Sequence, residues 1–181
     1  ISLVIKKIFF IYIILTIICF ISYYYFGMSV FDSITHSFST ISTGGFSTHD
    51  NSFAYFQDNR ILLISMLFML IGSFPFIILA QISLKKPLIL FQDQQVRLFI
   101  MIIISLIASL YLLVGDQISS SISQKIITIS FNSISIITGT GFVSDNFEQW
   151  GNYSSILFLF IMFIGGCAGS TTGGLKIFRF Q

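Results

Sequence analysis

Three long apolar runs without a charged residue constrain this chain more than any other feature of its sequence. They cover residues 8–25, 61–82 and 98–114. A helix rises about 1.5 Å per residue, so roughly 17 to 25 apolar residues cross the hydrocarbon core of a bilayer. Charged residues make up only 9% of the chain, against roughly 25% in soluble domains. We therefore expect an all-α integral membrane protein with lipid as its main solvent.

Two of the predicted spans are interrupted. The second run contains Pro75, which predicts a kink because proline removes a backbone hydrogen bond. A fourth run, residues 153–164, is too short to span alone, and glycines separate it from its continuation at residues 175–180. The chain begins with Ile1 and stops abruptly after the last run. We expect four spans, the last one interrupted, within an internal fragment of a longer protein.

Two other apolar segments, residues 30–47 and 122–143, are rich in Ser and Thr and too short to cross a membrane as helices. Each begins with the Ser-x-x-Asp or Ser-x-x-Gln spacing that starts a helix, at Ser29 and Ser121. Each ends in glycines. We therefore expect a short helix followed by an extended strand, folded back into the membrane as a re-entrant pore loop.

The order span, short helix, glycine loop, span occurs twice, and an offset of 96 residues aligns the two copies. We expect repeat A over residues 1–84, a cytoplasmic linker over 85–96 and repeat B over 97–181, which is a potassium-channel-like architecture. Five positions are identical in the aligned loops: Ser37/Ser133, Ser39/Ser135, Ile41/Ile137, Gly45/Gly141 and Phe46/Phe142.

Charged residues predict the orientation of the spans. Seven basic residues and one acidic residue fall on one side: Lys6, Lys7, Lys85, Lys86, Arg97, Lys176, Arg179 and Asp93. Six acidic and two basic residues fall on the other: Asp32, Asp50, Asp58, Asp116, Asp145, Glu148, Arg60 and Lys125. The positive-inside rule makes the first side cytoplasmic. Both glycine loops then open toward the outside, where acidic side chains form a solvated mouth.

The two glycine loops are the candidate ion-binding filter. At membrane depth a non-helical backbone must be buried in protein or line a watery cavity. Glycine permits torsions that point successive carbonyls the same way, and a row of carbonyl oxygens replaces the hydration shell of a cation. Glycines that serve only close packing are the alternative, but two loops at equivalent positions favour a pore. The predicted filter residues are Thr43, Gly44, Gly45, Phe46, Gly139, Thr140, Gly141 and Phe142.

A third glycine-rich stretch interrupts the last span and is a candidate gating loop on the cytoplasmic side of the filter. So many glycines make a poor helix, although a kinked helix packed through its glycines is the alternative. A phosphate-binding loop is excluded, because no lysine directly follows a glycine as that motif requires. The predicted gating residues are Gly165, Gly166, Gly169, Ser170, Thr171, Gly173, Gly174 and Lys176.

Other polar residues do not form an active site. His36 and His49 lack a third ligand at suitable spacing, so we expect structural hydrogen bonds rather than metal binding. Trp150 is expected at the membrane interface. No nucleophile pairs with a base, and the basic residues do not form a stripe. The sequence therefore predicts neither an enzyme nor a partner of nucleic acid, and no bound metal other than K⁺ at the filter.

Three stretches, residues 36–50, 135–147 and 163–179, closely resemble the Trk/Ktr/HKT superfamily of potassium transporters, above all its bacterial Trk potassium-uptake branch. The resemblance implies the second and third of four span–pore-helix–span repeats around one pore. It also implies that Gly45 and Gly141 are the filter glycines, with the neighbouring residues supplying carbonyls, and that an intramembrane loop gates the pore.

The resemblance further implies potassium uptake across the bacterial inner membrane, with K⁺ as the transported ion and no covalently bound cofactor. The expected partners are membrane lipid, the remaining repeats of the same subunit, a second subunit in a homodimer and a cytosolic nucleotide-binding regulatory subunit. Symport with H⁺ or Na⁺ and uncoupled transport stay open. A sodium-conducting relative and a non-conducting membrane scaffold or assembly subunit are the alternative functions.

Overall fold

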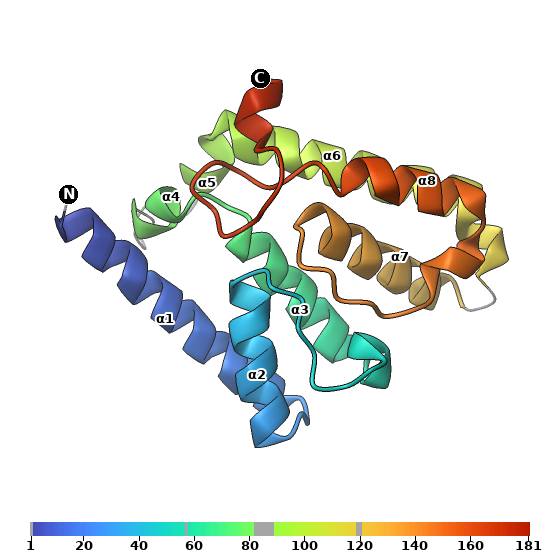
Figure 1. Cartoon of the computed structure of the whole chain (residues 1–181), viewed down its shortest axis with the longest axis horizontal. Helices are drawn as coiled ribbons and strands as arrows, with labels where there is room; N and C mark the ends of the chain where they lie inside the picture. The colour runs from blue at the N-terminus through green and yellow to red at the C-terminus, as the bar shows by residue number, and fades with distance from the viewer. Residues whose placement is uncertain (1, 57, 82–88, 119–120) are drawn as a thin grey trace.

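The computed structural model describes residues 2–56, 58–81, 89–118 and 121–181. Its regular secondary structure is helical, apart from one isolated bridge between Ile164 and Leu175, and irregular loops join the helices (Figure 1). This confirms the all-helical prediction. The α-helices are α1 (Ser2–Tyr25), α2 (Val30–Ile41), α3 (Asn59–Gly72), α4 (Phe76–Gln81), α5 (Ile89–Gln92), α6 (Gln94–Val114), α7 (Ile122–Ile137) and α8 (Asn152–Ile161). Short 3₁₀ turns are η1 (Ser52–Tyr55), η2 (Gly115–Gln117), η3 (Phe147–Trp150) and η4 (Ile177–Phe180).

Two helices, α1 and α6, are long and apolar enough to cross a membrane. They correspond to the first and third predicted spans. Ile82, Lys85, Lys86 and the side chain of Asp116, on which parts of the span and charge predictions rest, lie outside the described residues.

The two short helices begin where the sequence predicts. The Ser29 hydroxyl accepts a hydrogen bond from the Asp32 amide at 3.1 Å, and the Ser121 hydroxyl accepts one from the Gln124 amide at 3.4 Å. These caps satisfy amides that have no partner inside the first turn of a helix. The helices end at Ile41 and Ile137, which are equivalent in the 96-residue alignment, so the glycine loops start at matching positions.

The second predicted span is broken rather than kinked at Pro75. Helix α3 ends at Gly72, and α4 starts only at Phe76. Proline disfavours the helical conformation of the residue before it and cannot donate a hydrogen bond. The break therefore begins ahead of Pro75 and leaves backbone groups near Gly72, Ser73 and Phe76 in need of partners.

Helix α2 buries its polar face and exposes its apolar one. Phe31 and Phe38 are 68% and 56% exposed, whereas Ser33, His36 and Thr40 are completely buried. In water this arrangement would be unfavourable, because apolar side chains would stay exposed to solvent and polar side chains would lose their hydration on burial. It suits a short helix whose outer face meets lipid or apolar protein and whose inner face meets a polar interior.

One buried hydroxyl joins helices α1, α2 and α3. The Tyr23 hydroxyl of α1 lies 2.8 Å from Thr40 Oγ1 on α2 and donates to Ser65 Oγ on α3 at 3.0 Å. The two repeats meet where α3 packs against α7. There the Phe53 ring lies 4.3 Å from the Phe142 ring and 5.4 Å from the Phe131 ring, centroid to centroid. Phe142 belongs to the second glycine loop, so this aromatic cluster packs directly against that loop.

Replacing Tyr23 by Phe is expected to lower the free energy of unfolding in detergent micelles by about 1 kcal/mol, the typical value of a hydrogen bond between membrane helices. Thermal denaturation followed by circular dichroism measures the effect. Tyr24→Phe is the matched control, because Tyr24 is 56% exposed. Equal stability of the two variants would show that the Tyr23 hydroxyl contributes nothing to helix association.

Candidate functional site

The two glycine loops repeat the same unusual backbone. Thr43 and Gly45 have φ angles of 52° and 72°, and the equivalent Gly139 and Gly141 have φ angles of 69° and 85°. The residues between them do not have positive φ angles. This alternation allows successive carbonyls to face one side, as a carbonyl-lined cation site requires.

Thr43 occupies a position that glycine holds in the other repeat. A β-branched residue with a positive φ angle is strained, and such strain costs on the order of 1–3 kcal/mol. The Thr43 hydroxyl donates to the Ser42 carbonyl at 2.7 Å, which gives this hydroxyl a partner inside its own turn. Strain of this kind is typical of functional sites.

Each loop is tied to the short helix that precedes it. The Gly44 amide donates to the Ser39 carbonyl at 2.8 Å, and the Gly141 amide donates to the Ser135 carbonyl at 3.1 Å. Ser39 and Ser135 are equivalent in the repeat alignment. Only Ser135 also donates its hydroxyl to the loop, to the Phe142 carbonyl at 2.7 Å. The Phe142 carbonyl is thus engaged by the protein, unlike a carbonyl that is free to bind a cation.

The two loops touch each other at their glycines. A methyl group on the Cα of Gly45 would overlap the carbonyl oxygen of Thr140. Farther along, the Ala54 amide donates to the Val143 carbonyl at 3.0 Å, and the Val143 amide donates to Ser52 Oγ at 3.2 Å. Elements about 90 residues apart in sequence therefore form one continuous site.

The third glycine-rich stretch, residues 163–176, is a closed loop, and it contains all the predicted gating residues. The Gly165 amide donates to the Leu175 carbonyl and the Leu175 amide donates to the Phe163 carbonyl, both at 2.8 Å. The Lys176 ammonium group donates to Ser170 Oγ at 3.2 Å and also contacts the Thr172 carbonyl. The loop is therefore folded by its own hydrogen bonds, so the alternative of a kinked helix is excluded.

This loop lies against the break between α3 and α4 and supplies the partners that the break needs (Figure 1). Three backbone hydrogen bonds cross between them, at 3.0 to 3.1 Å: Cys167 N to Ser73 O, Thr171 N to Gly72 O and Phe76 N to Gly169 O. The sequence predicted a kink at Pro75 and the loop separately, but it contained no signal that the two would pair.

The loop also reaches the end of the first short helix and the second glycine loop. Thr171 Oγ1 lies 2.9 Å from both the Ile41 carbonyl at the end of α2 and the Gly72 carbonyl. A Cβ atom on Gly139 would lie 3.8 Å from the Gly173 amide nitrogen. The loop therefore lies next to the C-terminal end of α2 and the start of the second glycine loop.

Polar side chains surround the start of α2. The Asp32 carboxylate accepts hydrogen bonds from Thr48 at 2.6 Å and from Ser29 at 2.7 Å, and His49 Nε2 lies 3.2 Å away from it. Burial acts to raise the pKa of Asp32, but these hydrogen bonds and the neighbouring His49 outweigh burial and lower it. The carboxylate is therefore ionised at neutral pH.

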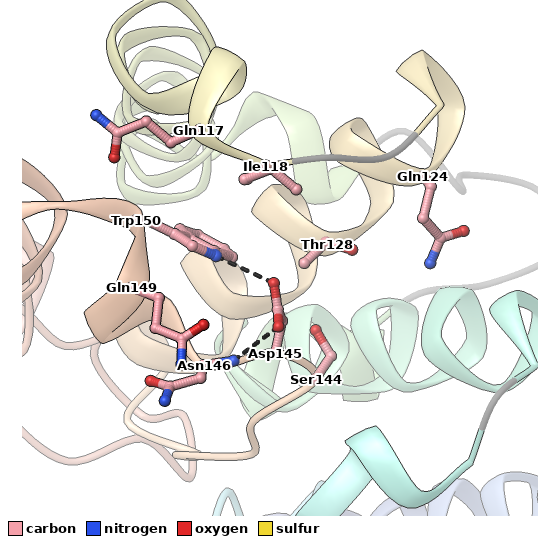
Figure 2. Close-up of a pocket in the computed structure, with 9 residues that line it drawn as sticks. All are labelled: Gln117, Ile118, Gln124, Thr128, Ser144, Asp145, Asn146, Gln149 and Trp150. Carbon is pink, nitrogen blue, oxygen red and sulfur yellow. Dashed lines mark hydrogen bonds between the residues drawn. The ribbon is translucent and has the colours of Figure 1, made fainter.

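A polar cavity of about 440 Å³ lies next to the segment that leaves the second glycine loop (Figure 2). Trp150, predicted at the membrane interface, is only 3% exposed, and its indole nitrogen donates to Asp145 at 3.0 Å. A buried indole needs such a partner. Within the described residues no group of three His, Cys, Asp or Glu side chains is arranged to hold a metal ion.

Two long apolar helices, an outward-facing apolar surface and three interlocking glycine-rich loops are the features of a membrane protein that moves cations. The chain belongs to the TrkH family, described as "Cation transport protein", whose model matches residues 1–181. This is a family of transporters and not of enzymes.

Similar proteins extend this result. The chain is 39% identical over 178 residues to the Trk system potassium uptake protein TrkH of Vibrio parahaemolyticus, covering 96% of this chain and 37% of the relative. It is 35% identical over 167 residues to the Trk system potassium uptake protein TrkI of Halomonas elongata, covering 92% and 34%. It thus spans about a third of the length of these relatives.

The fold agrees with a solved structure. The crystal structure of the potassium transporter TrkH from Vibrio parahaemolyticus matches with a TM-score of 0.90 at 39% sequence identity, over 97% of this chain and 38% of that chain.

Alanine substitutions separate strain from steric overlap in the glycine loops. Gly141→Ala and Gly27→Ala place a side chain at φ angles of 85° and 99° with open space around it, so each is expected to cost about 1–3 kcal/mol of stability. Gly45→Ala adds an overlap with backbone and should cost clearly more. Thermal unfolding measures all three. A Gly45→Ala variant no less stable than Gly27→Ala would contradict the close approach of the loops.

Proposed function

We propose that the intact subunit containing this chain takes up potassium across the bacterial inner membrane through a filter built from its glycine loops. The observation that carries the proposal is the alternating backbone at residues 43–45 and 139–141, with Gly45 against Thr140. The relatives named Trk system potassium uptake proteins support K⁺ as the transported ion.

In this proposal the chain supplies the second and third of four span–pore-helix–span repeats. Residues 1–84 form the first of these two, residues 85–96 form a cytoplasmic linker and residues 97–181 form the second, each with a re-entrant filter loop. The fact that the chain covers about a third of its relatives' length is consistent with a longer subunit that completes the ring.

Potassium loses its hydration water at the filter and binds backbone carbonyls there. Residues 43–46 and 139–141 supply those oxygens, while Phe142, whose carbonyl accepts a hydrogen bond from Ser135, forms the wall. The C-terminal, partially negative ends of α2 and α7 lie next to the same loops and stabilise a cation. Binding must offset dehydration yet remain weak enough for release.

Residues 165–174 form the gate of the proposed pathway, and Lys176 holds them folded. The loop contacts the carbonyl end of α2 through Thr171 and approaches Gly139 through Gly173. In this closed position it occupies the cytoplasmic side of the filter. Opening requires that the loop leave the break between α3 and α4.

The proposed partners follow from the resemblance to bacterial Trk proteins and from the charge distribution. A second subunit forms a homodimer in which each protomer has its own pore. A cytosolic nucleotide-binding subunit controls the gate from the side that carries Arg97, Lys176 and Arg179.

Ion flux into liposomes tests this function. The intact subunit is expected to admit rubidium in preference to sodium. Gly141→Ala should reduce that preference roughly tenfold, because strain that weakens rubidium binding relative to sodium binding by about 1.4 kcal/mol changes the ratio of the two affinities by that factor. Gly27→Ala, equally strained but outside the filter, is the control. An inserted subunit that passes neither ion, even with its regulatory partner, would favour the scaffold, and equal passage of both would favour the sodium-conducting alternative.

Removing the Thr171 hydroxyl tests the gate. Thr171→Val keeps the side-chain shape and the backbone bond to Gly72 but loses the hydroxyl's bonds to the Ile41 and Gly72 carbonyls. The closed loop should therefore be destabilised by about 1 kcal/mol, and rubidium flux should rise roughly fivefold with unchanged ion preference. Thr16→Val is the control, because the Thr16 hydroxyl bonds only within its own helix, to Tyr12. Unchanged flux in the Thr171 variant would argue against this loop as the gate.

A further inference from the structure

Each short helix carries a completely buried polar side chain, at the same position in the repeat alignment, that bonds to the segment leaving the glycine loop. The two residues are His36 on α2 and Asn132 on α7. They are 96 residues apart and therefore occupy the same position in the two repeats. Both are completely buried, and both lie on the side of the short helix that faces its own glycine loop.

The His36 ring spans two backbone segments of repeat A. Its Nδ1 lies 2.8 Å from the Asp32 carbonyl one turn earlier, and its Nε2 lies 3.0 Å from Ser47 Oγ. Ser47 is two residues after Gly45. The rings of Phe53 and Phe56 each pack edge-on against the imidazole with centroids 5.3 Å away, so the ring orientation is fixed by packing.

The Asn132 carboxamide makes the corresponding contacts in repeat B. Its Nδ2 donates to the Thr128 carbonyl one turn earlier and to Ser144 Oγ, both at 2.9 Å, and its Oδ1 accepts from the Ser144 amide at 3.3 Å. Ser144 is three residues after Gly141 and lines the polar cavity (Figure 2). Two different side chains thus repeat one pattern, a bond to the carbonyl four residues earlier and a bond to the outgoing strand.

These bonds hold the outgoing segment to its helix, together with the bond of Thr48 to Asp32 and that of Ser135 to the Phe142 carbonyl. The strands after Gly45 and Gly141 have no regular secondary structure, so their backbone has no ladder to fix its position. A buried donor without a partner costs a full desolvation penalty. Loss of Ser47 would impose that penalty on His36, and loss of the Ser144 hydroxyl would impose it on Asn132. A carbonyl site that distinguishes two cations needs its oxygens held within about 0.5 Å.

We propose that His36 and Asn132 are positioning residues that set the width of the filter at its outer end and thereby its preference between potassium and sodium. The inference rests on the filter function proposed above. Neither side chain touches the ion. They act through Ser47 and Ser144, which connect the rigid short helices to the strands that continue from the filter carbonyls.

Substitutions on the strand test this inference in the intact subunit. Ser47→Ala and Ser144→Ala each remove the hydroxyl partner of the helix side chain, and each is expected to lower the rubidium-to-sodium flux ratio roughly two- to tenfold, the factor that corresponds to one hydrogen bond. Ser47→Thr and Ser144→Thr keep a hydroxyl and should restore most of the ratio. Ser105→Ala on α6 is the control, because Ser105 is exposed and bonds only to Ile102 of its own helix.

A double substitution shows whether the helix side chain and the strand serine act as one unit. Asn132→Leu has nearly the same shape without the amide, and it should reduce the flux ratio as Ser144→Ala does. The double variant should be no worse than Asn132→Leu alone, because both changes break the same bond. Potassium-dependent protection against thermal unfolding, compared with sodium, provides a second readout that needs no flux.

The outcomes separate this inference from the filter function. If the parent subunit prefers rubidium and the serine-to-alanine variants keep that preference while folded, the positioning role is wrong and the filter function stands. Fully additive effects of Asn132→Leu and Ser144→Ala would also contradict it. If the parent itself shows no preference, the filter function fails and the positioning role falls with it.

Discussion

The structure depends on finding partners for backbone groups that are released where helices break. In a bilayer no water is available to satisfy them, so every non-helical segment must be paired inside the protein. The break ahead of Pro75 frees groups at Gly72, Ser73 and Phe76, and the loop of residues 163–176 pairs with all three. The same loop closes on itself at Gly165 and Leu175. A helix break in one repeat therefore fixes the position of an irregular loop in the other.

The two glycine loops at residues 43–46 and 139–142 satisfy their backbone groups in a different way. The Gly44 and Gly141 amides bond back to the short helices, at Ser39 and Ser135. Among the loop carbonyls, that of Phe142 accepts a bond from the helix, from Ser135, while those of residues 43–46 and 139–141 are the proposed ion ligands. In a low-dielectric site such oxygens gain most by meeting a cation. The repeats are not identical in detail, since Thr43 stands in a strained position that Gly139 occupies without strain. The two halves of the site thus have related geometry and different chemistry.

Much of this architecture could be predicted from local sequence. Serine caps, apolar run lengths and the 96-residue offset are short-range signals, and they correctly gave α2, α7 and the matching loops. The size of the break at Pro75 and its pairing with the third loop depend on groups about 95 residues apart, which no local pattern encodes. The burial of Trp150 was missed because its partner, Asp145, lies in a turn that the sequence presents as solvated. His36 and Asn132 occupy equivalent positions in the two repeats, but they are different residue types. A comparison of identical residues therefore could not show that they play the same buried role.

The most direct test of the central claim is anomalous X-ray diffraction from crystals of the intact subunit grown with thallium or rubidium in place of potassium. Anomalous density is expected between the two loops, within coordination distance of the carbonyls of residues 43–46 and 139–141. That result would locate the ion where Gly45 meets Thr140. Well-ordered loops without density, or density only in the polar cavity near Asp145, would contradict a carbonyl-lined filter at this site.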